Sequence, residues 1–139
     1  MNDFVDKWLE NPYVSTLAFY TVAILAMVVF MTLFELVTKY SNWQEIRKGN
    51  VAVAMATGGK LFGIGNVFRF SIAANDSVYE SLIWATYGFV LLLAAYFIFE
   101  FATPWFNVDK EIARDNRAVG FISMVLSVAL SYVIGASVA

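Results

Sequence analysis

Lys60 lies within a long apolar segment of the chain, where an amino group is costly to bury. Ten residues separate it from Asn50, so a helix that begins at Asn50 carries it about 15 Å inward. Two acidic residues, Glu35 and Glu100, also fall within apolar segments. Because buried charges are paired, we expect Glu35, Lys60 and Glu100 to form a buried charge cluster. The cluster is either a structural ion pair or part of a polar pathway for protons or ions.

Two more polar residues follow Lys60 in the same segment. Asn66 either donates a hydrogen bond to a neighbouring helix or lines a polar path together with Lys60. Arg69 lies near the far end of the helix, where it either reaches out to water or pairs with Asp76 or Glu80.

The sequence excludes several classes of site. It contains no His and no Cys, so the commonest metal ligands and disulfides are missing, and we expect no metal and no cofactor. The stretch "GGKLFGIG" (58–65) lacks the spacing of a phosphate-binding loop. No nucleophile–base pair and no nucleic-acid-binding patch is visible. The sequence therefore predicts a protein that is not an enzyme.

The composition is that of an integral membrane protein, because 60% of the residues are hydrophobic and only 14% are charged. Four segments are long enough to cross a bilayer as helices, at about 13–37, 51–73, 78–102 and 118–139. Residues 1–12 precede them as either a short interfacial helix or a frayed polar tail. We expect one all-α membrane domain, residues 1–139, in contact with the lipid bilayer.

The basic residues predict the orientation. Loops 38–50 and 103–117 each hold three Lys or Arg residues, whereas the loop between the second and third spans has none. By the positive-inside rule, these two loops are cytoplasmic and both termini lie on the outer side. The loops are then available to a peripheral cytoplasmic partner or to anionic lipid.

Two stretches of the chain resemble each other. Phe34, Glu35, Thr38 and Asn42 match Phe99, Glu100, Thr103 and Asn107 at an offset of 65. At an offset of 66, Glu45, Ile46, Asn50, Ala52 and Val53 match Glu111, Ile112, Asn116, Ala118 and Val119. The pattern predicts two tandem two-helix hairpins, about 13–73 and 78–139, with Asn50 and Asn116 as helix N-caps.

Small residues recur at helical spacing in the second and fourth spans, which allows close contact between helices. The residues that we expect in helix packing are Ala52, Ala56, Gly59, Gly63, Ser123, Ser127, Ser131 and Gly135. The simplest arrangement puts these two spans at the centre and the first and third outside. In the alternative arrangement, one small-residue ridge forms a homo-oligomer contact.

The chain resembles the YjfL-like family of small bacterial inner-membrane proteins, also known as domain of unknown function 350. The resemblance rests on the stretch "EIRKGNVAVAMATGGKLFG", on its echo in the second half and on the four-span length. It implies a bacterial cytoplasmic-membrane location and an association with envelope-stress systems, and it supplies no catalytic residues.

From these observations we expect a non-enzymatic multi-pass protein, an oligomeric scaffold or accessory component of envelope maintenance or stress response. The alternative is a small oligomeric ion or proton channel or transporter that uses Glu35, Lys60 and Glu100.

Overall fold

The computed structural model describes residues 3–105 and 107–138, without the side chain of residue 101. All regular elements in these residues are helices. Their bounds are α1 Asp3–Leu9, α2 Pro12–Val37, α3 Asn42–Arg47, α4 Val51–Ala74, α5 Val78–Ala102, α6 Val108–Ala113 and α7 Arg117–Val138. The two ends of the predicted domain, residues 1–2 of the N-terminal segment and residue 139 of the last span, lie outside the described residues.

Four of these helices, α2, α4, α5 and α7, are long and apolar enough to cross a membrane. They confirm the prediction of an all-α membrane protein with four spans. The segment before the first span contains a helix, α1, and its place at the bilayer interface stays a prediction. The sequence did not predict α3 and α6, the six-residue helices that lie in loops 38–50 and 103–117.

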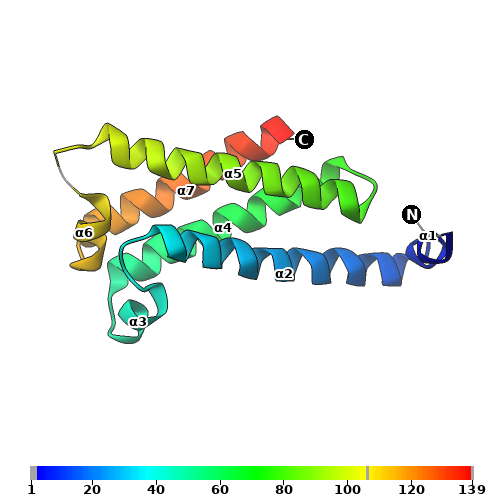
Figure 1. Cartoon of the computed structure of the whole chain (residues 1–139), viewed down its shortest axis with the longest axis horizontal. Coiled ribbons are helices and arrows are strands. Elements are labelled where there is room, and N and C mark those ends of the chain that lie inside the picture. The colour runs from blue at the N-terminus through cyan, green and yellow to red at the C-terminus, as the bar shows by residue number, and fades with distance from the viewer. Residues whose placement is uncertain (1–2, 106, 139) are drawn as a thin grey trace.

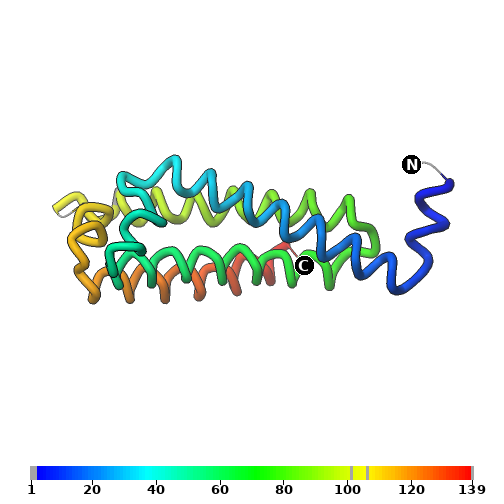
Figure 2. Tube along the Cα trace, turned by 90° about the horizontal axis from the view of Figure 1, so that it is seen from below, coloured from blue at the N-terminus to red at the C-terminus, as the bar shows by residue number. Residues whose placement is uncertain are grey.

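The four long helices run side by side, with α3 and α6 together at one end of the bundle (Figure 1). The turn between α4 and α5 and the short helix α1 lie toward the other end (Figure 1). Seen from below, α2 and α5 form one layer over most of their length and α4 and α7 form the other (Figure 2). Helix α1 turns sharply away from the direction of α2 (Figure 2).

Helix α4 is the centre of the bundle, because most of its span is buried inside the chain. Aromatic rings from α2 and α5 pack against it. Phe30 stacks on Phe89 with ring centroids 4.3 Å apart, and it also stacks on Phe68 of α4 at 5.9 Å. Helix α7 packs closely on α4, but most of its span lies at the surface of the single chain, so the expected central position of α7 stays a prediction. Only one side of α7 packs on the bundle.

The contact between α4 and α7 depends on residues without bulky side chains. A Cβ added to Gly59 would lie 2.7 Å from the Cα of Met124, and one added to Gly120 would lie 2.7 Å from the Cα of Ala52. Deeper in the bundle, a Cβ on Gly63 would lie 3.2 Å from the carbonyl oxygen of Ser127. The two backbones therefore approach each other at a distance that only glycine permits at Gly59 and Gly120, and that leaves little room at Gly63.

The remaining residues expected in packing are distributed over the same two helices. Ala56 is fully buried with Ala52 near the loop end of α4, and Ser123 and Ser131 are buried on α7. Gly135, in contrast, lies against the ring of Phe70, so at this end of α7 a glycine faces an aromatic side chain.

Candidate functional site

The side chain of Lys60 is enclosed by aromatic rings. It is only 2% exposed, and its Nζ lies 5.3 Å from the ring centroid of Phe34, 5.9 Å from that of Tyr40 and 5.1 Å from that of Tyr96. We call these three residues the aromatic cage. An amino group over ring faces is attracted by their negative quadrupoles. The cage comes from α2, from the residues just after α2, and from α5, so Lys60 of α4 connects several elements.

The amino group of Lys60 has no hydrogen-bond partner among the described residues. Buried polar groups normally have one, so an orphaned amine at membrane depth needs an explanation. Thr57, one turn before Lys60 on α4, and Tyr40 of the cage also carry buried hydroxyls without a partner in this part of the structure.

Asp109 is a buried acidic residue next to the aromatic cage. It is 1% exposed, accepts a hydrogen bond from the hydroxyl of Tyr96, and accepts another from the backbone N–H of Lys39 at 3.1 Å. Burial raises the pKa of Tyr40, and the carboxylates of Asp109 and Glu100 raise it further, so both acids lie near the cage.

The predicted ion pair between Lys60 and the glutamates is not formed: no carboxylate lies within 4.0 Å of the Lys60 amino group in the described part of the chain. Glu35 does not reach Lys60 because its side chain leaves α2 in another direction. Phe34 occupies the inward position on α2, and the next residue is turned by about 100°. Glu35 is therefore half-exposed and accepts a hydrogen bond from Ser41 Oγ at 3.3 Å.

Glu100 lies one turn beyond Tyr96 on α5 and is also half-exposed. It lines a pocket of about 370 Å³ beside α6, together with Lys39, Thr103 and Asn107. Glu35 lines a different pocket, together with Asn42 and Trp43, so the two glutamates have separate surroundings. The role of Glu35, Lys60 and Glu100 as one cluster stays a prediction.

The other predicted polar residues of α4 have separate surroundings. Asn66 donates a hydrogen bond from Nδ2 to the Oγ of Ser131 on α7 at 3.1 Å. Arg69 is exposed, and its guanidinium carbon lies 5.3 Å from the ring centroid of Phe70. Arg69 forms no ion pair with Asp76 or Glu80 within the described ranges. Neither residue approaches the aromatic cage by any contact that the structure shows.

Two asparagines in the loops before α4 and α7 cap the first turns of these helices. Asn50 Oδ1 accepts from the N–H of Val53 at 3.0 Å, and Asn116 Oδ1 accepts from the N–H of Val119 at 3.4 Å. Both asparagines are thus helix N-caps, as predicted. Each also donates from Nδ2 to the glutamate five residues before it, at 3.3 Å to Glu45 and 2.9 Å to Glu111.

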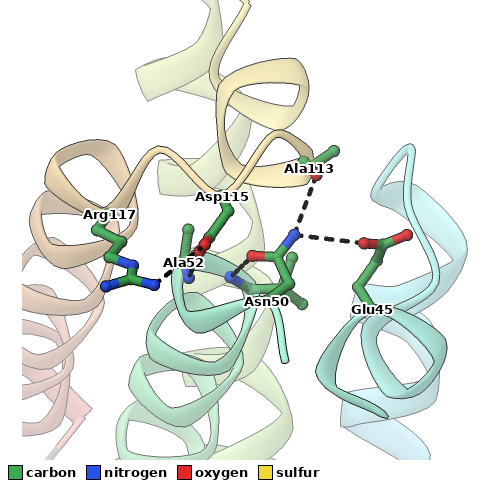
Figure 3. Close-up of polar contacts among 7 residues, drawn as sticks. Glu45, Asn50, Ala52, Ala113, Asp115 and Arg117 are labelled. Atoms are coloured by element: carbon green, nitrogen blue, oxygen red, sulfur yellow. Dashed lines mark hydrogen bonds and ion pairs between the residues drawn. The ribbon is translucent and has the colours of Figure 1, made fainter. Parts of the chain in front are cut away.

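The second loop also reaches across to the start of α4 (Figure 3). Asp115 Oδ1 accepts from the N–H of Ala52 at 2.9 Å, and Asn50 Nδ2 donates to the carbonyl oxygen of Ala113 at 3.0 Å. These bonds, drawn in Figure 3, join residues 63 positions apart in the chain. The N–H of Ala52 holds the pKa of Asp115 below its usual range, and Arg117 lowers it further.

The two loops also share an unusual backbone conformation. Gly49 has φ of 86°, and Asp115, 66 residues later, has φ of 63°. Glycine adopts this region freely, whereas aspartate does so less readily. The two loops thus share their helix caps and their backbone conformation. Their origin in a tandem repeat stays a prediction.

Sequence reasoning missed Asp109, Tyr96 and the rest of the cage. Asp109 lies in a charged loop, a pattern typical of solvent-exposed residues, and Tyr96 lies in the third span, which we expected on the outside of the bundle. One signal was available for Asp109. It follows Asn107, which caps the short helix α6 by accepting from the N–H of Lys110, and so it lies in the first turn of a helix. Gly120 was also missed, although it lies three residues before Ser123 on the same ridge.

Comparison with known proteins identifies the family. The family described as Domain of Unknown Function (DUF350) matches residues 8–138, which is nearly the whole chain. The chain belongs to the DUF350 family. The resemblance seen in the sequence is therefore confirmed.

A curated relative of this DUF350 protein is the UPF0719 transmembrane protein YshE of Bacillus subtilis (strain 168). It is 58% identical over 138 residues, which cover 99% of this chain and 100% of the relative. Its name agrees with the four long apolar helices, so the DUF350 protein is a transmembrane protein. No solved structure matches the chain.

Proposed function

We propose that this DUF350 protein is a non-enzymatic multi-pass protein of the bacterial cytoplasmic membrane that acts as an oligomeric scaffold or accessory component of envelope maintenance or stress response. The observation that supports a structural role is the enclosure of Lys60. Its amino group is covered by the aromatic cage, and on the next turns of the same helix Ile64, Val67 and Phe68 bury apolar side chains. The buried Asn66 among them is already bonded to Ser131. A pathway for ions would need polar groups at these positions.

Further support comes from how the elements around Lys60 are connected. Tyr96 bonds Asp109, and Asp109 bonds the backbone of Lys39, so α5, α6 and the end of α2 are held together next to the lysine. A rigid loop end of this kind suits a surface that meets a peripheral partner. In loops 38–50 and 103–117, Lys48, Arg114 and Arg117 already pair with acidic neighbours, which leaves Lys39, Arg47 and Lys110 as the basic groups best suited to a partner or to anionic lipid.

Flux measurements on the reconstituted protein test this proposal against the channel alternative. Wild type and Lys60→Met are placed in liposomes that contain a pH-sensitive dye, and proton flux is measured under an imposed potential. We expect no flux above that of empty liposomes in either protein. Flux in the wild type that disappears in Lys60→Met would establish the channel instead. Native mass spectrometry of the same samples measures the oligomeric state, and a monomer would contradict the scaffold.

Cysteine labelling tests the proposed orientation, because the natural chain has no Cys. Asn42, an obvious loop position, is 1% exposed and therefore unsuitable, whereas Gln44 and Asp76 are exposed. We expect Asp76→Cys to react with a membrane-impermeant maleimide in intact cells and Gln44→Cys to react only after lysis. The reverse pattern would invert the topology.

A further inference from the structure

An apolar groove runs between α5 and α7 and ends at Lys60. Its volume is about 410 Å³, which is within the range of about 300–1,000 Å³ that is usual for small-molecule sites. Leu92, Leu126 and Leu130 line its apolar length, and Lys60, Phe34 and Tyr96 lie at its inner wall. Since α5 and α7 are membrane-spanning helices with mostly exposed surfaces, the groove faces the hydrocarbon region.

The groove and the orphaned amine point to the same kind of occupant. Lys60 is 2% exposed, and its Nζ has no hydrogen-bond partner among the described residues. That Nζ lies near two groove-lining rings, 5.3 Å from the centroid of Phe34 and 5.1 Å from that of Tyr96. An amine that finds no acceptor inside the chain is complementary to an acidic head that enters from outside.

We propose that the groove between α5 and α7 binds a long-chain carboxylate, with its alkyl chain along the leucines and its head at the amino group of Lys60. Depth favours a carboxylate over a phosphate-headed lipid. Lys60 is ten residues below Asn50, about 15 Å from the loop end, and a carboxylic acid can reach this depth as the neutral acid. At Lys60 the head pairs as a carboxylate with the ammonium: the O–H bond of the acid breaks and its proton is released to water. The ammonium–carboxylate pair carries no net charge.

Photolabelling of the purified full chain in phosphatidylcholine vesicles tests the site. The probe is palmitic acid with a diazirine in its chain, and the comparison probe is the alcohol with the same chain and diazirine. Intact mass gives the yield, and peptide mapping gives the labelled residues. We expect the acid to label α5 and α7 about tenfold more than the alcohol does, since hydrogen bonds to charged groups change affinity by this order.

Three variants separate the site from general lipid contact. Lys60→Met removes the amine, and Ala95→Phe fills the groove while leaving Lys60 in place. We expect both to reduce labelling by the acid to the level of the alcohol. Leu25→Phe, a change on the exposed side of α2, controls for added aromatic surface and leaves labelling unchanged. If Lys60→Met does not fold, as judged by circular dichroism and gel filtration, Ala95→Phe decides the result.

Equal labelling by acid and alcohol in the wild type would overturn the proposal, since the groove would then hold any alkyl chain. Acid labelling that persists in both groove variants, or that maps to helices other than α5 and α7, would overturn it as well. The proposal goes beyond the scaffold function. The flux measurement and the labelling measurement are independent, so either idea can fail alone.

Discussion

The hydroxyl of Tyr96 donates a hydrogen bond to Asp109, and this bond joins a membrane-spanning helix to a short helix outside the membrane. Asp109 also accepts from the backbone N–H of Lys39, just after the first span. One buried carboxylate thus connects α5, α6 and the end of α2. It lies next to the aromatic cage without touching the amine of Lys60 directly.

A double-mutant cycle on Tyr96 and Asp109 measures this connection. We expect Tyr96→Phe and Asp109→Asn each to lower the free energy of unfolding. The coupling should be about 0.6 kcal/mol, the average for hydrogen bonds between membrane helices, and at most about 1.7 kcal/mol. Unfolding is followed by circular dichroism during titration with SDS in mixed micelles. Tyr87→Phe, on the exposed surface of the same helix, is the matched control. Strictly additive effects would show that the bond contributes nothing.

Lys60 and Phe34 are expected to be coupled through the cage. Comparing Lys60→Met and Phe34→Leu, alone and together, should give a coupling energy of about 0.5–2 kcal/mol, since an amine over an aromatic face contributes this amount. Phe30→Leu is the matched control, because Phe30 stacks on Phe68 and Phe89, away from the amine. If Phe30 coupled to Lys60 as strongly as Phe34 did, the coupling energy would not come from the cage.

Adjacent glycines on α4 offer a test of the contact with α7. A Cβ at Gly59 would lie 2.7 Å from the Cα of Met124, whereas a Cβ at Gly58 would meet nothing within 4 Å. We expect Gly59→Ala to destabilise the bundle by about 1–3 kcal/mol through overpacking. Gly58→Ala should be neutral or stabilising by up to about 1 kcal/mol, because alanine favours helix. The same SDS titration measures both, and equal effects would contradict the close approach of the two backbones.

Asp115 makes the stability depend on pH. Its pKa in the folded chain lies below the ordinary value of about 3.9, because the N–H of Ala52 donates to its carboxylate. Its contribution to stability is therefore complete above that value and is lost as the pH falls through the lower folded pKa.

The test compares Asp115→Asn with the wild type by thermal unfolding between pH 2.5 and 6, a range set about the ordinary aspartate pKa. Asparagine accepts the same bond and tolerates the positive φ of 63°, but it does not titrate, so we expect a smaller loss of stability in acid. Asp76→Asn, at the other end of the bundle, should leave the acid loss unchanged. A profile in Asp115→Asn that matches the wild type would assign the acid sensitivity to other carboxyl groups.

The sequence predicted the four spans well, because a bilayer demands about 20 apolar residues whatever the neighbouring helices are. It also predicted the caps at Asn50 and Asn116, since capping depends on local spacing. The short helices α3 and α6 were missed. At six residues each they are too short to show a periodic pattern, and tertiary contacts hold them.

The surroundings of Lys60 were harder to predict. Helices α2 and α5 are apolar on all sides, so their sequences do not show which residues face the bundle. The inward positions belong to Phe34 and Tyr96, and the acidic residue bonded to the cage is Asp109, which charge alone would place in water. The depth of Lys60 in an apolar segment predicted its burial, but its neighbours depend on helix rotation.

The bonds from the second loop to the start of α4 have a consequence for biosynthesis. The N–H of Ala52 meets its acceptor, Asp115, only after another 63 residues have been made. At about 5–20 residues per second, the ribosome needs roughly 3–13 s to supply them. During that interval the first hairpin is already long enough to insert, with an incomplete helix start at the membrane surface. A nascent chain halted before Asp115 should therefore be a preferred substrate for membrane proteases.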